Sequence, residues 1–133
     1  MLSAFGASDN AYRSVPFEKR RQDAEAIIAK YPDRVPIICE RVKGDKEVPD
    51  IDKKKYLVPN DLTIGQFMYI IRKRMQLTST KALFLFVNNG TLVPVSELIK
   101  NVYDVHRDTD GFLYLKYSGE NAFGTGDIVA LVA

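Results

Sequence analysis

The sequence predicts a single domain of the α+β class, in which helices pack on a mixed β-sheet. The chain has 133 residues, of which 46% are hydrophobic and 27% are charged, and this suits one soluble domain with a core of its own. Hydrophobic periodicity predicts the element order helix, strand, strand, helix, strand, helix, strand. Strands that come early, give way to a helix and then return are typical of a mixed sheet covered by helices.

The first helix and the first two strands are predicted in the N-terminal half. Because proline is favoured in the first turn of a helix and disfavoured inside one, a helix should run from Pro16 to just before Pro32. Its apolar residues are Phe17, Ala24, Ile27, Ile28 and Tyr31. Runs at 35–42 and 53–58 predict two strands, which the loop GDKEVPDID connects.

A second helix is predicted at residues 63–75. Thr63 is followed three residues later by Gln66, which has the form of a capping box. Apolar residues recur at helical spacing, namely Ile64, Phe67, Ile70, Ile71 and Met75. Basic residues at 72–74 would lie in the last turn, where positive charge interacts favourably with the helix dipole.

The last three elements complete the predicted sheet. Residues 82–87 (ALFLFV) are apolar throughout and precede Asn-Asn-Gly, which predicts a buried strand entering a turn. A helix is predicted around the stripe Val95, Leu98, Ile99, Val102 and Val105, with Ser96 as its candidate cap, and residues 112–118 form the last strand. The β-grasp fold of ubiquitin has this plan. We therefore expect a β-grasp domain with a four-stranded mixed sheet and an additional N-terminal helical segment.

The composition excludes several classes of protein. Nineteen Lys and Arg against seventeen Asp and Glu leave a net charge of +2, too little to indicate nucleic-acid binding by itself. One Cys and one His cannot form an internal disulfide or a four-ligand zinc site, so we expect no metal and no cofactor. Residues 1–15 lack the pattern of a signal peptide, and the apolar run 128–133 is shorter than the ~20 residues of a membrane span. A cytoplasmic location is expected.

The residues with reactive side chains favour structural roles, so no catalytic residue is predicted. Cys39 lies in a predicted buried strand and is expected to be a core thiol. His106 lies near the end of a helix, and Asp108 and Asp110 have the pattern of a turn. A hydrolase would need a nucleophile with its base, and no triad pattern surrounds His106. An RNA-binding module would need an RNP, KH or zinc-knuckle pattern, and none is present.

Eight motifs then identify a family resemblance. They are PFEKRR (16–21), KYPDRVP (30–36), DKKKYLVP (52–59), LTIGQF (62–67), IRKR (71–74), FVNN (86–89), GFLY (111–114) and SGENAFG (118–124). Together they closely resemble the GABARAP-like ubiquitin-like autophagy modifiers, the autophagy-related protein 8 family. The resemblance covers residues 16–124, which it marks as the modifier domain, between an N-terminal arm (1–15) and a C-terminal tail (125–133).

The resemblance implies a protein that is not an enzyme and that has several partners. In this family, a cysteine protease trims the C-terminus to a glycine, and an E1-like enzyme activates the new carboxyl group with ATP. An E2-like enzyme then transfers it to phosphatidylethanolamine. The lipidated protein lies on the autophagosome membrane, where it recruits cargo receptors and adaptors. Before lipidation a cytoplasmic monomer is expected.

The resemblance also indicates where this chemistry would occur. Phe123 and Gly124 match the family's aromatic-glycine ending, and nine residues, 125–133, lie beyond them. This implies cleavage between Gly124 and Thr125 and lipid attachment at Gly124. A glycine, which lacks Cβ, suits a narrow enzyme channel. The residues alone leave open that 128–133 form a fifth strand and that Gly124 is only a turn residue.

The segment 53–58 has the properties of a peptide-binding edge. Side chains alternate along a strand, so Lys53, Lys55 and Leu57 would face one way and Lys54, Tyr56 and Val58 the other. An extended peptide can add to an exposed strand by main-chain hydrogen bonds, with side-chain pockets on either side. The family's ligands carry an aromatic residue and, three positions on, Leu, Ile or Val, which would point to opposite faces.

Two pockets are carried over from the family to matching positions. The aromatic pocket would comprise Asp23, Ile27, Pro36, Ile38, Lys55, Leu57 and Phe112. The aliphatic pocket would comprise Tyr56, Val58, Pro59, Leu62, Phe67 and Ile70. Acidic residues preceding the ligand's anchors would meet Lys53, Lys55 and Arg34. The residues alone leave open that the lysines are a solvated face and that Phe67 and Ile70 are core residues.

Where the sequence departs from the family pattern, we expect partner preference to be affected most. Asp23 stands where a longer acid is common, and the loop 44–50 does not match GABARAP closely. One further function stays open within the family. The chain could be a trafficking or microtubule-associated adaptor that uses the same pockets without lipidation.

Overall fold

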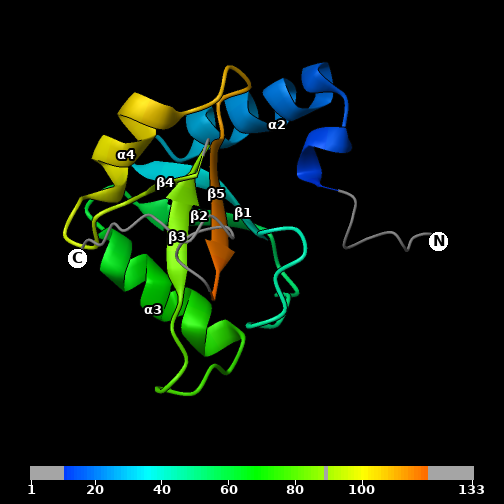
Figure 1. The fold of residues 1–133 in the computed structure, drawn as a ribbon. Helices are drawn as coiled ribbons and strands as arrows, with labels where there is room; N and C mark the ends of the chain where they lie inside the picture. Colours follow the sequence, from blue (N-terminus) through cyan, green and yellow to red (C-terminus); the bar gives the residue numbers. More distant parts are fainter. Residues whose placement is uncertain (1–10, 89, 120–133) are drawn as a thin grey trace.

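The fold is a five-stranded mixed sheet with helices on both faces (Figure 1). The computed structural model describes residues 11–88 and 90–119. In chain order the elements are the 3-10 helix η1 (Tyr12–Ser14), α2 (Phe17–Lys30), β1 (Arg34–Arg41), β2 (Lys55–Pro59), α3 (Ile64–Arg74), β3 (Phe84–Val87), β4 (Thr91–Leu92), α4 (Ile99–His106) and β5 (Leu113–Ser118).

The strand order is β2-β1-β5-β3-β4, which places β1 and β5 in the middle of the sheet. These two strands run parallel, with Ile37 opposite Leu113, whereas all other pairs are antiparallel. Both central strands are buried along most of their length. This explains why they read as nearly continuous apolar runs in the sequence, because a strand covered on both faces needs no polar side.

The predicted α+β class and β-grasp plan are confirmed, with one strand more than expected. The additional strand, β4, pairs with the end of β3, with Leu92 opposite Phe86. The turn before it was predicted, and the amide of Gly90 donates to the carbonyl of Val87 at 2.9 Å. Gly90 has φ of 87°, a region open to glycine. A strand of two residues is too short to show an alternating pattern.

Helix α3 begins as the sequence predicts. The hydroxyl of Thr63 accepts from the amide of Gln66 at 3.1 Å, and the amide of Thr63 donates to Oε1 of Gln66 at 2.9 Å. These two bonds complete the capping box.

Helix α4 begins later than predicted, and the expected cap at Ser96 is wrong. Its N-cap is Leu98, which makes no side-chain capping bond. The preceding residues bond instead to the start of α3, where the amides of Ile64 and Gly65 donate to the carbonyls of Glu97 and Val95, both at 2.9 Å. These bonds hold the chain out of helical geometry before Ile99.

The sheet separates two apolar clusters of unequal size. Helices α3 and α4 cover the main core, to which β1 contributes Val35, Ile37 and Cys39. Helix α2 covers the opposite face (Figure 1), over a satellite cluster of Ala24, Ile38, Phe112 and Tyr114. Cys39 is fully buried, and this burial raises the pKa of its thiol, so the predicted core thiol is confirmed. No helix within the described ranges is long and apolar enough to cross a bilayer.

Candidate peptide-binding site

Strand β2 forms one edge of the sheet. Among the described strands it pairs with β1 alone, in a register that runs from Arg34 opposite Pro59 to Ile38 opposite Lys55. Its side chains alternate as predicted, with Tyr56 and Val58 buried and Lys55 exposed. The predicted segment began two residues too early, since Lys53 and Lys54 precede the strand. An edge strand offers unpaired backbone groups to a further strand.

An apolar groove of about 430 Å³ crosses this edge. Its lining comes from both faces of the sheet: Ile27 from α2, Lys53, Lys55, Tyr56 and Leu57 from the β2 segment, and Ile70 and Arg74 from α3. Since α2 and α3 lie on opposite sides of the sheet, a peptide along β2 could place one anchor against each helix. This is the geometry that an odd spacing between anchors requires in an extended chain.

The structure brings the residues of the predicted aromatic pocket together. Ile38 and Phe112 are fully buried in the satellite cluster, and Ile27 packs against it. Pro36 is buried and lies opposite Leu57 in the strand register. On the rim, Nζ of Lys55 lies 3.9 Å from a carboxylate oxygen of Asp23 and 5.9 Å from the centroid of the Phe112 ring.

The residues of the predicted aliphatic pocket divide into two groups. Tyr56, Val58 and Phe67 belong to the main core, where the Tyr56 and Phe67 rings meet edge to face at 5.5 Å between centroids. Burial raises the pKa of Tyr56 to about 12, and its buried hydroxyl has no hydrogen-bond partner among the described residues. Leu62, Pro59 and Ile70 are partly or largely exposed, so Ile70 and its neighbours form the accessible wall.

The basic residues are placed at different ends of β2. Lys53 and Lys55 line the groove, whereas Arg34 lies opposite Pro59 at the far end of the strand. The structure therefore does not bring Arg34 together with Lys53. Arg74 also lines the groove and bonds to Asp52 at 3.1 Å. Arg74 was not predicted as a site residue, although its position four residues after Ile70 on α3 places both side chains on one face of the helix.

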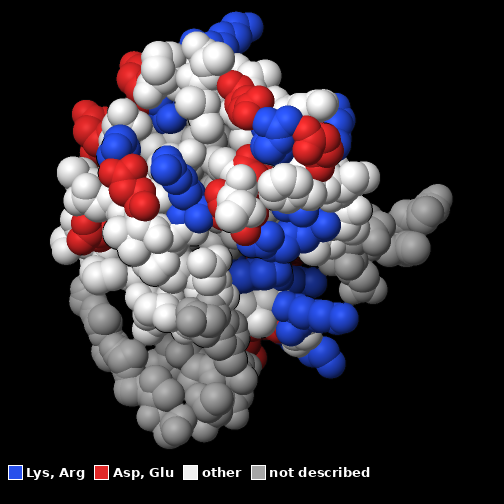
Figure 2. Space-filling view, turned by 90° about the horizontal axis from the view of Figure 1, so that it is seen from above, with Lys and Arg blue, Asp and Glu red and all other residues white. Residues whose placement is uncertain are grey.

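Positive charge gathers in one region of the face seen in Figure 2, although Lys and Arg also occur elsewhere on it. On α2, acidic and basic side chains pair with each other, as in Arg21 with Glu18 and Glu25. Seen from above, Lys and Arg side chains gather along one side of the molecule, with few acidic side chains between them (Figure 2). The small net charge therefore coexists with a distinctly basic region.

A buried ion pair fixes α2 on the sheet. Nη1 of Arg20 lies 2.6 Å from a carboxylate oxygen of Asp110, which also accepts a hydrogen bond from the hydroxyl of Tyr114. The other oxygen of Asp110 accepts from the amide of Phe112 at 2.8 Å, which confirms the predicted turn. The ion pair and its hydrogen bonds join α2 to the start of β5. They therefore position Asp23, one turn further along α2, beside the groove.

One aromatic residue of the N-terminal arm, Tyr12, also lies at this site, and it was not predicted as a site residue. The ring of Tyr12 packs edge to face against Phe112, with 5.5 Å between centroids. Nζ of Lys55 lies 5.2 Å from the centroid of the Tyr12 ring, and the Tyr12 hydroxyl lies 3.4 Å from Asp23. Three residues of the predicted aromatic pocket therefore contact a side chain of the same chain.

The predicted cleavage site and the alternative fifth strand lie outside the described residues, so Phe123, Gly124 and Thr125 stay predictions. The last described residues are held by the β1–β2 loop. The hydroxyl of Ser118 and the amide of Gly119 donate to the same oxygen of Asp45, at 3.0 and 3.4 Å. These two hydrogen bonds hold the end of β5 against the β1–β2 loop.

A family model, curated relatives and a solved structure that this chain resembles all carry the name Atg8 or autophagy-related protein 8. A family model described as "Autophagy protein Atg8 ubiquitin like" matches residues 19–124. The autophagy-related protein 8 of Kluyveromyces lactis is 54% identical over 116 residues, covering 86% of this chain and 92% of its own. Autophagy-related protein 8e of Arabidopsis thaliana is 57% identical over 112 residues, covering 84% and 90%. The crystal structure of Trypanosoma brucei ATG8 has a TM-score of 0.75 at 45% identity, covering 80% of this chain and 90% of its own.

Proposed function

This chain belongs to the Atg8 family of ubiquitin-like autophagy proteins, and from that premise we propose that it is cut after Gly124 and joined there to phosphatidylethanolamine. The match to the family model ends at residue 124, and nine residues of the chain follow it. Within the family, the motifs quoted above support a place in the GABARAP-like branch.

The proposed conjugation uses the chain as a substrate rather than as an enzyme. A cysteine protease hydrolyses the bond between Gly124 and Thr125, and ATP-dependent activation by an E1-like enzyme makes the new carboxyl group an electrophile. An E2-like enzyme transfers it to the amine of the lipid. The nucleophilic thiols belong to these partners, and the burial of Cys39 supports this division because a buried thiol with a raised pKa is a poor nucleophile.

Lipid attachment would move the protein from the cytoplasm to the autophagosome membrane. Each buried methylene of an acyl chain contributes ~0.8 kcal/mol, so the two chains of one lipid give firm anchoring.

We further propose that the β2 edge binds short segments of cargo receptors and adaptors that carry an aromatic residue followed three positions later by Leu, Ile or Val. The observation that carries this proposal is the apolar groove across an open sheet edge, with Ile27 on one side and Ile70 on the other. Lys53 and Lys55 line its basic end, which favours acidic residues before the aromatic anchor.

The conjugation is tested by the mass of the protein in cells that carry out autophagy. Intact mass spectrometry should detect a form that ends at Gly124 and a second form with one added phosphatidylethanolamine. Gly124→Ala should abolish the lipidated form, while Gly126→Ala in the tail serves as the matched control. If Gly124→Ala left processing and membrane association unchanged, the conjugation would be refuted and the adaptor role without lipidation would replace it.

The groove is tested by titrating a synthetic peptide with an aromatic-x-x-Leu core. Leu57→Ala removes a half-buried side chain from the groove without touching the main core, and we expect it to weaken binding roughly tenfold. Val105→Ala, on an exposed face of α4, is the matched control. Equal affinity of both variants would place the peptide elsewhere.

A further inference from the structure

The N-terminal arm places an aromatic ring where the proposed function would place the ligand's aromatic anchor. Tyr12 contacts Phe112, Lys55 and Asp23, all of which belong to the predicted aromatic pocket. It also packs against the satellite cluster that contains Ile38. An edge-to-face ring contact and a neighbouring cation are the interactions that an incoming aromatic side chain would itself make.

The shape of the groove agrees with this occupancy. Its lining includes Ile27, Lys55 and Leu57 but not Ile38 or Phe112, which are fully buried. The ring of Tyr12 covers part of the cluster that these two residues form. The outer half of the predicted aromatic pocket is therefore open, whereas its inner half is already filled by the chain.

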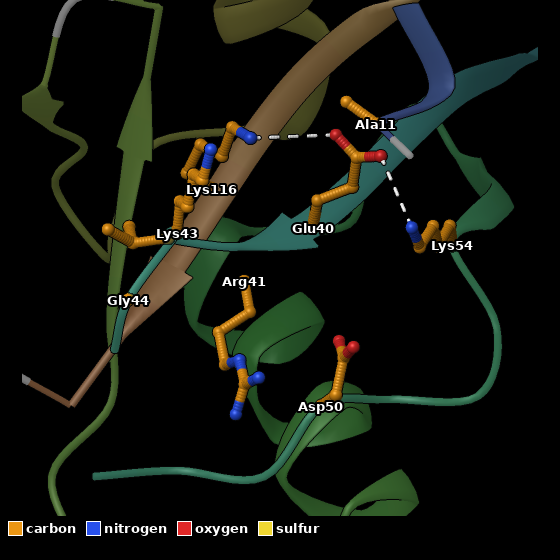
Figure 3. A pocket seen from close by; sticks show the side chains of 9 residues that line it. Ala11, Glu40, Arg41, Lys43, Gly44, Asp50, Lys54 and Lys116 are labelled. Carbon is orange, nitrogen blue, oxygen red and sulfur yellow. Dashed lines mark ion pairs between the residues drawn. The ribbon is translucent and has the colours of Figure 1, made fainter. Parts of the chain in front are cut away.

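A hydrogen bond to strand β1 holds the backbone of Tyr12 in place. The amide of Tyr12 donates to a carboxylate oxygen of Glu40 at 2.7 Å. The Glu40 carboxylate is largely buried, and it is flanked by Nζ of Lys54 and Nζ of Lys116, each at 3.6 Å. In Figure 3 the Glu40 side chain points toward both lysines, with Ala11 of the arm beside it.

The described part of the arm, residues 11–15, is held by few contacts, as a replaceable segment would be. Helix η1 has three residues, none of them buried, and no side-chain cap at its start. Beyond Tyr12 its anchors are Arg13, whose guanidinium lies 3.8 Å from the centroid of the Tyr114 ring and 2.9 Å from Asp108, and the adjoining Val15, whose carbonyl accepts from Nε of Arg20 at 2.9 Å. Because these contacts are few and partly exposed, the segment can open locally without unfolding the sheet.

We propose that Tyr12 is a built-in occupant of the aromatic pocket, which a peptide's aromatic anchor must displace before it binds fully. This inference rests on the proposed peptide-binding function. Tyr12 therefore lowers the apparent affinity for such peptides, because only the fraction of molecules in which Tyr12 is displaced offers the complete pocket. Peptides with an aromatic anchor compete with Tyr12, and peptides without one do not.

The test uses the full chain and two synthetic peptides, one with a Trp-x-x-Leu core and one with an Ala-x-x-Leu core. We expect Tyr12→Ala to tighten binding of the Trp peptide by roughly three- to tenfold and to leave the Ala peptide unchanged. Tyr12→Phe, which keeps the ring, is the matched control and should bind like the unaltered protein.

A second measurement needs no substitution. Hydrogen exchange of the Tyr12 amide, which Glu40 protects in the unbound state, should become faster when the Trp peptide is added to the unaltered protein. Unchanged exchange together with equal or weaker binding by Tyr12→Ala would overturn the proposal, because Tyr12 would then be a fixed wall of the pocket. If the unaltered protein and every variant failed to bind the Trp peptide, the peptide-binding function itself would fall.

Discussion

The two faces of the sheet are held by different kinds of interaction. The face under α3 and α4 carries a large apolar cluster, into which Phe67 and Ile71 are fully buried. The face under α2 has a cluster of four buried residues, and its helix is held by the buried pair of Arg20 and Asp110. The smaller cluster also contains two residues of the predicted aromatic pocket, Ile38 and Phe112, and Tyr12 packs against it. The comparison shows that extensive apolar packing supports one face of the sheet, whereas a small cluster and a buried ion pair support the other.

The largest effect should come from the main core. Phe67→Ala removes a ring that packs against Tyr56, and we expect the free energy of unfolding to fall by about 3–5 kcal/mol. Urea unfolding measures this loss. Val105→Ala, at a site that is 75% exposed, should change stability by less than about 0.5 kcal/mol. Similar losses for both variants would mean that the main core is not the dominant support.

Loss of the buried carboxylate on the other face should rank second. Asp110→Asn removes the charge that faces Arg20 but keeps a polar side chain of similar size, and we expect a loss of about 3 kcal/mol. Hydrogen exchange should increase most in α2, which the pair holds in place. Asp104→Asn, which breaks the exposed pair with Lys100, is the matched control and should cost less than about 1 kcal/mol. A change confined to α3 would contradict the separation of the two faces.

The capping box should contribute less than either buried group. Thr63→Ala removes the hydroxyl that accepts from the amide of Gln66, and the expected cost is about 1 kcal/mol. Faster amide exchange in the first turn of α3 would show that the loss is local. The exposed Thr109→Ala provides the comparison. If the two variants were equally stable, the cap would add nothing to the packing of α3.

The smallest effect should be on the acid dependence of stability, through the ion pair of Asp108 with Arg13 of the arm. Burial by itself would raise the pKa of Asp108, but hydrogen bonds from Arg13 and the amide of Asp110, with the charges of Arg13 and Arg20, lower it below its ordinary value. Asp108 therefore stabilises the fold above about pH 4, and this contribution is lost as the pH falls through the lowered pKa. Thermal unfolding between pH 6 and pH 2 should show a shallower acid dependence for Asp108→Asn. An identical dependence would refute the role of this pair.

The features that the sequence predicted are those whose causes lie close together in the chain. The capping box involves residues three positions apart, and the apolar character of β1 and β5 follows from their burial on both faces. The start of α4 was missed because its position depends on hydrogen bonds from Ile64 and Gly65, which are distant in sequence. Strand β4 was missed because two residues carry no pattern.

The same distinction applies to the candidate site. That Tyr56 and Val58 face one way and Lys55 the other is a local property of an extended chain, and it was predicted; which of the two sides is buried was not. The position of Tyr12 was not, because its ring partner Phe112 belongs to the other end of the chain. Only the folded arrangement of β1, β5 and α2 brings these residues together.

The parallel pairing of β1 with β5 also constrains when the protein can fold. β1 is among the first elements to be synthesised and β5 is the last described strand, so the centre of the sheet stays incomplete until residue 118 is available. Long-range parallel pairing of this kind slows folding, since a long loop must close before its contacts form. A ribosome-bound chain would expose the apolar residues of β1 for most of its synthesis, and exposed apolar surface of this kind favours aggregation until β5 pairs with it.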